Sequence, residues 1–116
     1  MIMPSNKAWQ VHDVNVLRCR GDLNANSMVE VKQAVTKLIH HKHRKVILDM
    51  AKAERADLAG LGILIERLKL VRSLHGDIKL CNLRPQVSET LRMVGVSKLI
   101  DSYASEEEAM KSFQFA

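Results

Sequence analysis

The sequence predicts an α/β fold with a central mixed, mostly parallel β-sheet of about five strands and about four helices. Short aliphatic or alternating runs of strand length alternate along the chain with longer runs whose apolar residues recur at helical spacing. The connections between these runs are short, which favours right-handed crossovers that pack helices against the sheet. The 116 residues have the size of one domain. We therefore expect a single domain over residues 1–116, with residues 1–6 frayed.

The composition indicates an aliphatic core, because 47% of the residues are hydrophobic and only 3% are aromatic. Cys19 and Cys81 lie in strand-like runs without metal or redox spacing, which predicts two buried thiols. No apolar run approaches ~18 residues and no signal-peptide pattern is present, so we expect a cytoplasmic protein. The net charge of +5 suits an acidic protein surface or anionic headgroups. We expect no nucleic-acid partner, since no nucleic-acid motif or aromatic platform accompanies the basic residues.

The first third of the chain predicts a β-hairpin followed by a helix. Residues 7–12 and 14–20 alternate polar and apolar side chains and are joined at His12 and Asp13. Ser27 and Glu30 have the spacing of a capping box, which predicts that the first helix begins at Ser27. The histidines and other basic residues of 40–45 indicate a solvated, cationic helix end and not a metal site, because no Cys or carboxylate accompanies them.

The stretch from 46 to 74 organises the rest of the prediction. Residues 46–50 form a buried strand, and a helix with Asp57 as a candidate N-cap follows over residues 58–74. Gly76 is predicted to stop this helix as a C-terminal glycine. The apolar stripe that we expect to face the core consists of Leu61, Leu64, Ile65, Leu68 and Val71. Ile63 and Leu70 fall away from that stripe, either as ordinary exposed residues or as part of a partner surface.

The last third predicts two further strands and two further helices. Residues 78–83 read as a central strand, and Pro85 suits the first turn of a helix that Gly95 ends. Residues 99–104 supply a last short strand. Ser105 then opens a second capping box, with Ala109, Met110 and Phe113 turned inward.

The motifs of catalysis are missing from the sequence. It has no nucleophile elbow, no phosphate-binding glycine loop and no paired-carboxylate signature, so we expect no enzyme and no cofactor. Asp22, Asp49 and Asp57 are interpreted as cap or turn residues. Ala59 and Gly60 lie in the first turn of the second helix, where backbone amides point outward and small side chains permit close approach. This turn is either a binding site or simply a tight strand–helix junction.

Several segments together resemble the STAS domain, the fold of bacterial anti-sigma-factor antagonists. The run Asp57-Leu58-Ala59-Gly60-Leu61-Gly62 is similar to the family's Asp-Ser-Ser-Gly-Leu-Gly, and it follows an aliphatic strand that ends at Asp49. Gly21-Asp22-Leu23-Asn24 resembles Gly-x-Leu-Asp before the first helix. Residues 91–96 resemble Leu-x-x-x-Gly-Leu. The resemblance covers nearly the whole chain and implies the STAS fold.

The resemblance also shows two departures from the family pattern. A serine or threonine of the Asp-Ser-Ser-Gly segment is phosphorylated by a partner kinase in regulated members, and the aligned residue here is Ala59. The preceding residue, Leu58, also lacks a hydroxyl. Asn24 stands where the family often has aspartate. The resemblance therefore implies a switch surface that lacks its phosphorylatable serine.

The implied function is a protein–protein interaction module in transcription regulation. Its implied partner is an anti-sigma factor with a GHKL-type kinase fold. The implied partner-binding residues are Asp22, Asn24, Asp57, Leu58, Ala59, Gly60, Leu61, Gly62, Ile63, Glu66 and Arg67. Alternatives are a STAS subunit that braces the ATPase of a lipid or ABC transport system, since one such group reads Asp-Thr-Ala-Gly here, or a scaffold subunit of a signalling assembly. A homodimer is a further alternative.

Overall fold

The computed structural model describes residues 13–114, and within them strands and helices alternate as the sequence predicts. The elements are β1 (Val14–Arg18), α1 (Ala25–His40), β2 (Lys45–Asp49), α2 (Leu58–Ser73), β3 (Asp77–Cys81), α3 (Pro85–Met93), the 3₁₀ turn η1 (Val96–Lys98), β4 (Ser102–Tyr103) and α4 (Glu106–Ser112). The strand predicted over residues 7–12, its hairpin and the frayed residues 1–6 lie outside the described residues.

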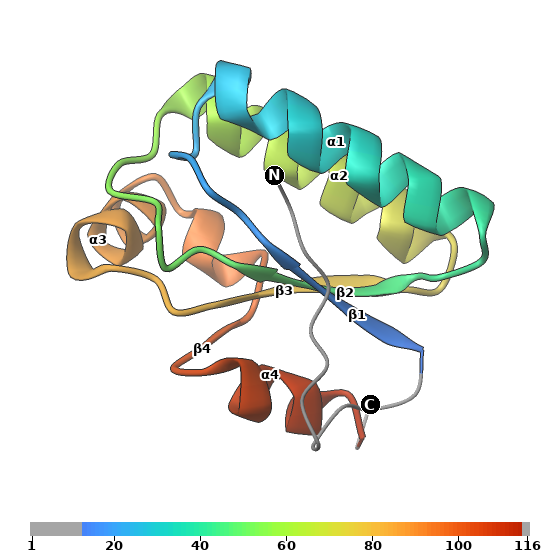
Figure 1. Cartoon of the computed structure of the whole chain (residues 1–116). Coiled ribbons are helices and arrows are strands. Elements are labelled where there is room, and N and C mark those ends of the chain that lie inside the picture. Colours follow the sequence, from blue (N-terminus) through green and yellow to red (C-terminus); the bar gives the residue numbers. More distant parts are fainter. Residues whose placement is uncertain (1–12, 115–116) are drawn as a thin grey trace.

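The four described strands form one parallel sheet in the order β1-β2-β3-β4. Because neighbouring strands are all parallel, a helical crossover separates each strand from the next. Helices α1 and α2 lie side by side on one face of the sheet, and α4 lies on the other (Figure 1). Helix α3 lies beside the carboxyl ends of the strands, where the loops that open the helices also gather.

The core has a larger layer under α1 and α2 and a smaller layer under α4. In α2, Leu61, Leu64, Leu68 and Val71 of the predicted stripe are buried, and Ile65 is half-buried. The predicted inward residues of α4 are also buried and pack on strand residues Val14, Val16 and Ile47. Lys79 is buried in this smaller layer, where its Nζ donates to Ser112 Oγ (2.8 Å) and lies 4.1 Å from the Phe113 ring centroid.

The predicted start of the first helix is wrong. Helix α1 begins at Ala25, and its N-cap is Asn24, whose side-chain oxygen accepts from the Ser27 amide at 2.8 Å. Ser27 is therefore the third residue of the helix and not its cap. Asn24 has the extended backbone that a cap requires (φ −130°, ψ 169°), and asparagine caps at least as well as serine.

The end of α2 also differs from the prediction. The left-handed residue after the helix is His75 (φ 66°), and Gly76 follows it. The Gly76 amide donates to the Val71 carbonyl (2.9 Å) and the His75 amide to the Arg72 carbonyl (3.0 Å), which is a Schellman motif shifted by one residue. Gly76 is needed for space, since a Cβ there would lie 2.0 Å from the Arg44 carbonyl oxygen.

The other helix boundaries in the last third agree with the sequence. Pro85 is the first residue of α3, Gly95 follows that helix with a φ of 82°, and Ser105 caps α4 by accepting from the Glu108 amide (3.1 Å). The last strand is shorter than predicted, because Leu99 and Ile100 form a turn and a bend and only Ser102 and Tyr103 pair with β3. Among the described helices, none combines the length and apolar character needed to cross a bilayer.

Candidate functional site

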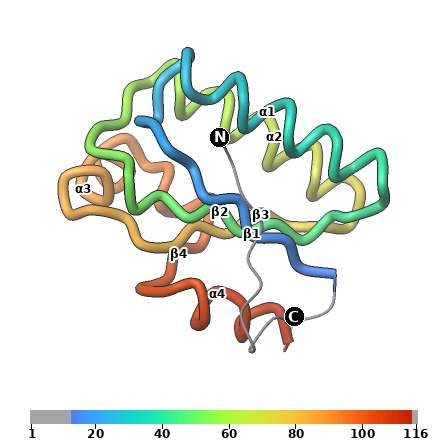
Figure 2. The backbone as a smooth tube through the Cα atoms, viewed as in Figure 1, coloured from blue at the N-terminus to red at the C-terminus, as the bar shows by residue number. Residues whose placement is uncertain are grey.

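The candidate site forms where the loops before α1 and α2 meet at the carboxyl end of the sheet. Leu23 and Ala56 form an isolated parallel bridge. The Leu23 amide donates to the Arg55 carbonyl (3.0 Å), and the Asp57 amide donates to the Leu23 carbonyl (2.9 Å). These bonds hold the two helix starts next to each other (Figure 2).

The two helices begin with the same capping geometry. Asp57 has φ −126° and ψ 170°, close to the values of Asn24, and its Oδ1 accepts from the Gly60 amide at 2.8 Å. The predicted N-cap role of Asp57 is thus confirmed. Since each cap side chain holds the amide three residues on, both first turns are fixed before any partner binds.

Gly60 allows the two loops to approach this closely. A Cβ at Gly60 would lie 2.2 Å from the Leu23 carbonyl oxygen, which is far inside any van der Waals contact. Gly62 lies on the same helix, and a Cβ there would meet no neighbouring atom within 4 Å. The first glycine is therefore required by the junction and the second is not.

The surface of the junction is formed by the first turn of α2 and by a braced loop. Leu58 is 74% exposed, and Ala59 beside it is also exposed. Asp22 fixes the loop before α2, because its Oδ1 accepts from the Glu54 amide at 2.7 Å. An open hollow of about 220 Å³ lies between the loops and is lined by Asp22, Leu23, Asn24, Arg55, Ala56 and Asp57.

The remaining residues implied by the resemblance differ in exposure. Gly62 and Glu66 are exposed on α2, whereas Leu61 is buried and Ile63 is half-buried against the core. Arg67 joins α2 to α1, since its Nη1 donates to Thr36 Oγ1 at 2.8 Å. Its hydrogen bonds to Glu66 lower the pKa of that carboxyl. Leu61 and Ile63 therefore support the surface from within, and Glu66 extends it.

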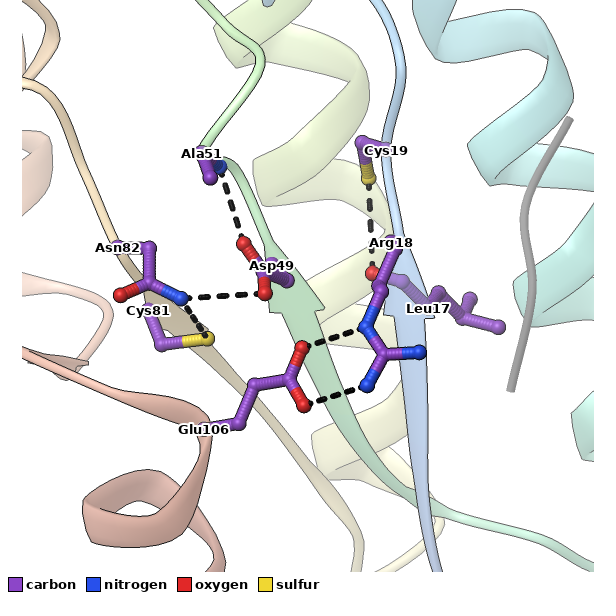
Figure 3. A network of polar contacts seen from close by, with 8 residues as sticks. All are labelled: Leu17, Arg18, Cys19, Asp49, Ala51, Cys81, Asn82 and Glu106. Atoms are coloured by element: carbon purple, nitrogen blue, oxygen red, sulfur yellow. Dashed lines mark hydrogen bonds and ion pairs between the residues drawn. The ribbon is translucent and has the colours of Figure 1, made fainter. Parts of the chain in front are cut away.

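A polar network below the junction was not predicted from the sequence (Figure 3). Asp49, interpreted as a turn residue, accepts from the Ala51 amide (3.0 Å) and from Asn82 Nδ2 (3.1 Å). Glu106 of α4 faces it and receives two bonds from Arg18, from Nε at 2.7 Å and from Nη2 at 2.8 Å. Burial, together with Glu106, raises the pKa of Asp49 to about 6.

The two cysteines lie near this network and are buried, as predicted. Burial raises the pKa of the Cys19 thiol to about 12 and also raises the pKa of Cys81. Neither is a thiolate at neutral pH, so neither has the reactivity of a nucleophile. Across residues 13–114, no three His, Cys, Asp or Glu side chains are placed together to hold a metal ion. His40 and His41 are exposed at the end of α1.

Comparisons with known proteins agree with the fold. The STAS domain family model matches residues 7–109. The anti-sigma F factor antagonist of Paenibacillus polymyxa is 24% identical over 102 residues, which cover 87% of each chain. Protein TM1081 of Thermotoga maritima has a similar structure, with a TM-score of 0.83, 22% identity and coverage of 96% of this chain and 92% of that one. The murine anion transporter Slc26a9 contains a similar fold (TM-score 0.79, 19% identity), which covers 91% of this chain but 18% of the transporter.

Proposed function

The chain belongs to the STAS domain family, and we propose that it is a binding module that acts as an anti-sigma factor antagonist. It would bind an anti-sigma factor in the cytoplasm without catalysing a reaction. The observation that carries this proposal is the exposed first turn of α2, held rigid beside the start of α1. The similarity along most of its length to an anti-sigma F factor antagonist supports the same role.

The proposed contact surface is centred on Leu58 and Ala59. Asn24 and Asp57 hold the two helix starts, and Asp22 braces the loop before α2. Because these polar groups already have partners within the chain, binding does not have to order the loops, which lowers its entropic cost. Leu58 supplies the apolar area, and Gly62 and Glu66 continue the surface along α2.

We propose further that phosphorylation at position 59 does not control this surface. Neither Leu58 nor Ala59 carries a hydroxyl group that could accept a phosphate. A phosphate here would add about −1.5 to −2 charges at the start of a helix and change the surface that a partner meets. The chain therefore stays in its binding-competent form even if the anti-sigma factor has the GHKL-type kinase fold that the family resemblance implies.

The proposal is tested by mixing the protein with a purified anti-sigma factor from the same genome. Calorimetry should show binding, and intact-mass analysis after incubation with ATP should show no added phosphate. Ala59→Ser should gain one phosphate, whereas the control Asn26→Ser, at the equivalent position of α1, should gain none. Failure of every anti-sigma factor of that genome to bind, or a stoichiometric phosphate on the wild-type chain, would contradict the proposal.

A transport-related role is the second candidate. The fold similarity to a segment of an anion transporter supports it, as does the net charge of +5, which suits a site near anionic headgroups. In that case the domain would brace a transporter ATPase, and affinity capture would recover an ABC-type ATPase in place of an anti-sigma factor. A scaffold or homodimer role would instead appear as self-association in light scattering.

A further inference from the structure

Two buried carboxyl groups face each other where α4 packs on the end of β2 (Figure 3). Asp49 and Glu106 are each only 8% exposed, and the proposed partner surface uses neither of them. Isolated buried carboxylates are costly, and two such groups side by side rarely both ionise. We propose that Asp49 and Glu106 share one proton, and that this proton couples the attachment of α4 to the loop that opens α2.

The charges around the pair favour a single proton. The Arg18 guanidinium of β1 approaches Glu106 with two bonds of 2.7 and 2.8 Å. The Cys81 thiol of β3 and the side-chain amide of Asn82, the next residue, face Asp49 from one side, and Cys19, the residue after β1, lies on the other side of Asp49. Both thiols stay neutral near pH 7 because burial raises their pKa values. Arg18 binds the Glu106 carboxylate directly, so Asp49 is the carboxyl that burial beside a second negative charge favours in its protonated form.

The geometry assigns the proton to Asp49. The paired bonds from Arg18 stabilise Glu106 as a carboxylate, since bidentate guanidinium contacts favour the charged form. Protonated Asp49 can then donate its O–H to the Glu106 carboxylate, while it still accepts from Ala51 and Asn82. The pKa of Asp49, raised to about 6, agrees with this assignment. The proton comes from solvent below that pH and returns to solvent above it.

Ala51 links Asp49 to the loop before α2. Its amide donates to Asp49 Oδ1 at 3.0 Å, and its carbonyl accepts from Arg84 Nε at 2.9 Å. The chain continues from Ala51 to the cap at Asp57, so Asp49 anchors the start of the loop and Asp57 its end. Loss of the proton leaves two carboxylates that repel each other, which weakens the contact of Glu106 with the sheet. It also makes Asp49, which accepts from the Ala51 amide, negatively charged.

The test is an NMR titration of the full chain between pH 4 and 8, following the Asp49 and Glu106 carboxyl carbons and the backbone amides of Ala51 and α4. We expect Asp49 to titrate with a midpoint near 6 and the Ala51 and α4 amides to shift with the same midpoint. Asp49→Asn keeps an acceptor oxygen for the Ala51 amide but has no carboxyl that can titrate, so it should remove that midpoint from both amide sets. Glu106→Gln should lower the midpoint of Asp49.

The control is Glu107→Gln, at the neighbouring residue of α4, which is exposed and pairs with Lys111. It should leave the midpoint unchanged. The proposal is overturned if Asp49 titrates below about pH 4.5 in the wild-type chain, within the ordinary range of an aspartate. It is also overturned if the Ala51 and α4 amides do not follow the midpoint of Asp49. Because the readout needs no partner, the result is independent of whether an anti-sigma factor binds.

Discussion

The starts of α1 and α2 are built alike but present different surfaces. Asn24 and Asp57 cap the two helices with nearly the same backbone angles, and each accepts from the amide three residues on at 2.8 Å. The second helical residue is the polar Asn26 in α1 and Ala59 in α2, where it follows the exposed Leu58. The caps therefore account for the rigidity of both helix starts, and the side chains of the first turn account for the recognition that we propose for α2 alone.

The largest expected effect is at the glycine that lets the two starts meet. Gly60→Ala places a methyl group 2.2 Å from the Leu23 carbonyl oxygen, and the loops must separate to admit it. We expect it to lower the free energy of unfolding by about 2–3 kcal/mol. Gly62→Ala meets open space in the same helix and should be neutral or stabilising by up to about 1 kcal/mol. Urea denaturation of both variants measures the difference, and equal free energies of unfolding would show that the junction is not tightly packed.

The second prediction compares the caps. Asn24→Ala and Asp57→Ala each remove one hydrogen bond to a first-turn amide and should each cost about 1 kcal/mol of stability. Asp57→Ala should cost a few tenths of a kcal/mol more, because a negative charge also interacts with the helix dipole. Asp57→Asn should recover most of the loss. Thermal unfolding at low salt measures the stability lost in each variant. A larger loss in Asn24→Ala than in Asp57→Ala would contradict the prediction.

The strands before the two helices also differ, since β1 ends at Arg18 and β2 ends beside it at the titrating Asp49. The pKa of Asp49 is raised from 3.8 in its ordinary state to about 6 in the folded chain, so folding takes up a proton between these pH values. This contribution to stability is complete below about pH 4 and is lost as the pH rises through 6. Relative to Asp49→Asn, the wild type should therefore lose stability over that range in thermal melts and stay level above it. The prediction would be contradicted if the melting temperatures of the wild type and of Asp49→Asn changed in parallel with pH.

The smallest expected effects on stability are at the exposed residues. Leu58→Ala and Ala59→Ser change side chains that point to solvent, and each should alter the free energy of unfolding by less than about 0.5 kcal/mol. If the proposed surface is correct, Leu58→Ala should still weaken partner binding measurably by calorimetry, and the same truncation at the exposed Val29 of α1 should not. A loss of folding in Leu58→Ala would indicate that Leu58 is structural.

Structural features that depend on neighbouring residues were predicted from the sequence, whereas features that depend on residues far apart in the chain were not. Asp57 was identified as a cap because the helical pattern begins directly after it. The start of α1 was misplaced because two cap signals compete within four residues, Asn24 and Ser27, and the bridge of Leu23 to Ala56 places the first of them at the junction. The Arg18–Glu106 pair joins residues 88 positions apart, so no local sequence pattern predicts it. Gly76 was predicted to be the C-terminal glycine of α2, but His75 takes the left-handed position, and Gly76 is required instead by the distant Arg44 backbone that packs against it.

The most direct test of the proposed surface compares one negative charge at the second residue of each helix. Ala59→Glu and Asn26→Glu both lie at exposed positions of a first turn, where an acidic side chain favours the helix, so both variants should fold. Their affinities for the anti-sigma factor are measured by calorimetry against the wild type. We expect Ala59→Glu to weaken binding at least about tenfold, or about 1.4 kcal/mol, and Asn26→Glu to change it less than about threefold. Equal affinities, or a larger loss from Asn26→Glu, would contradict the assignment of recognition to the start of α2.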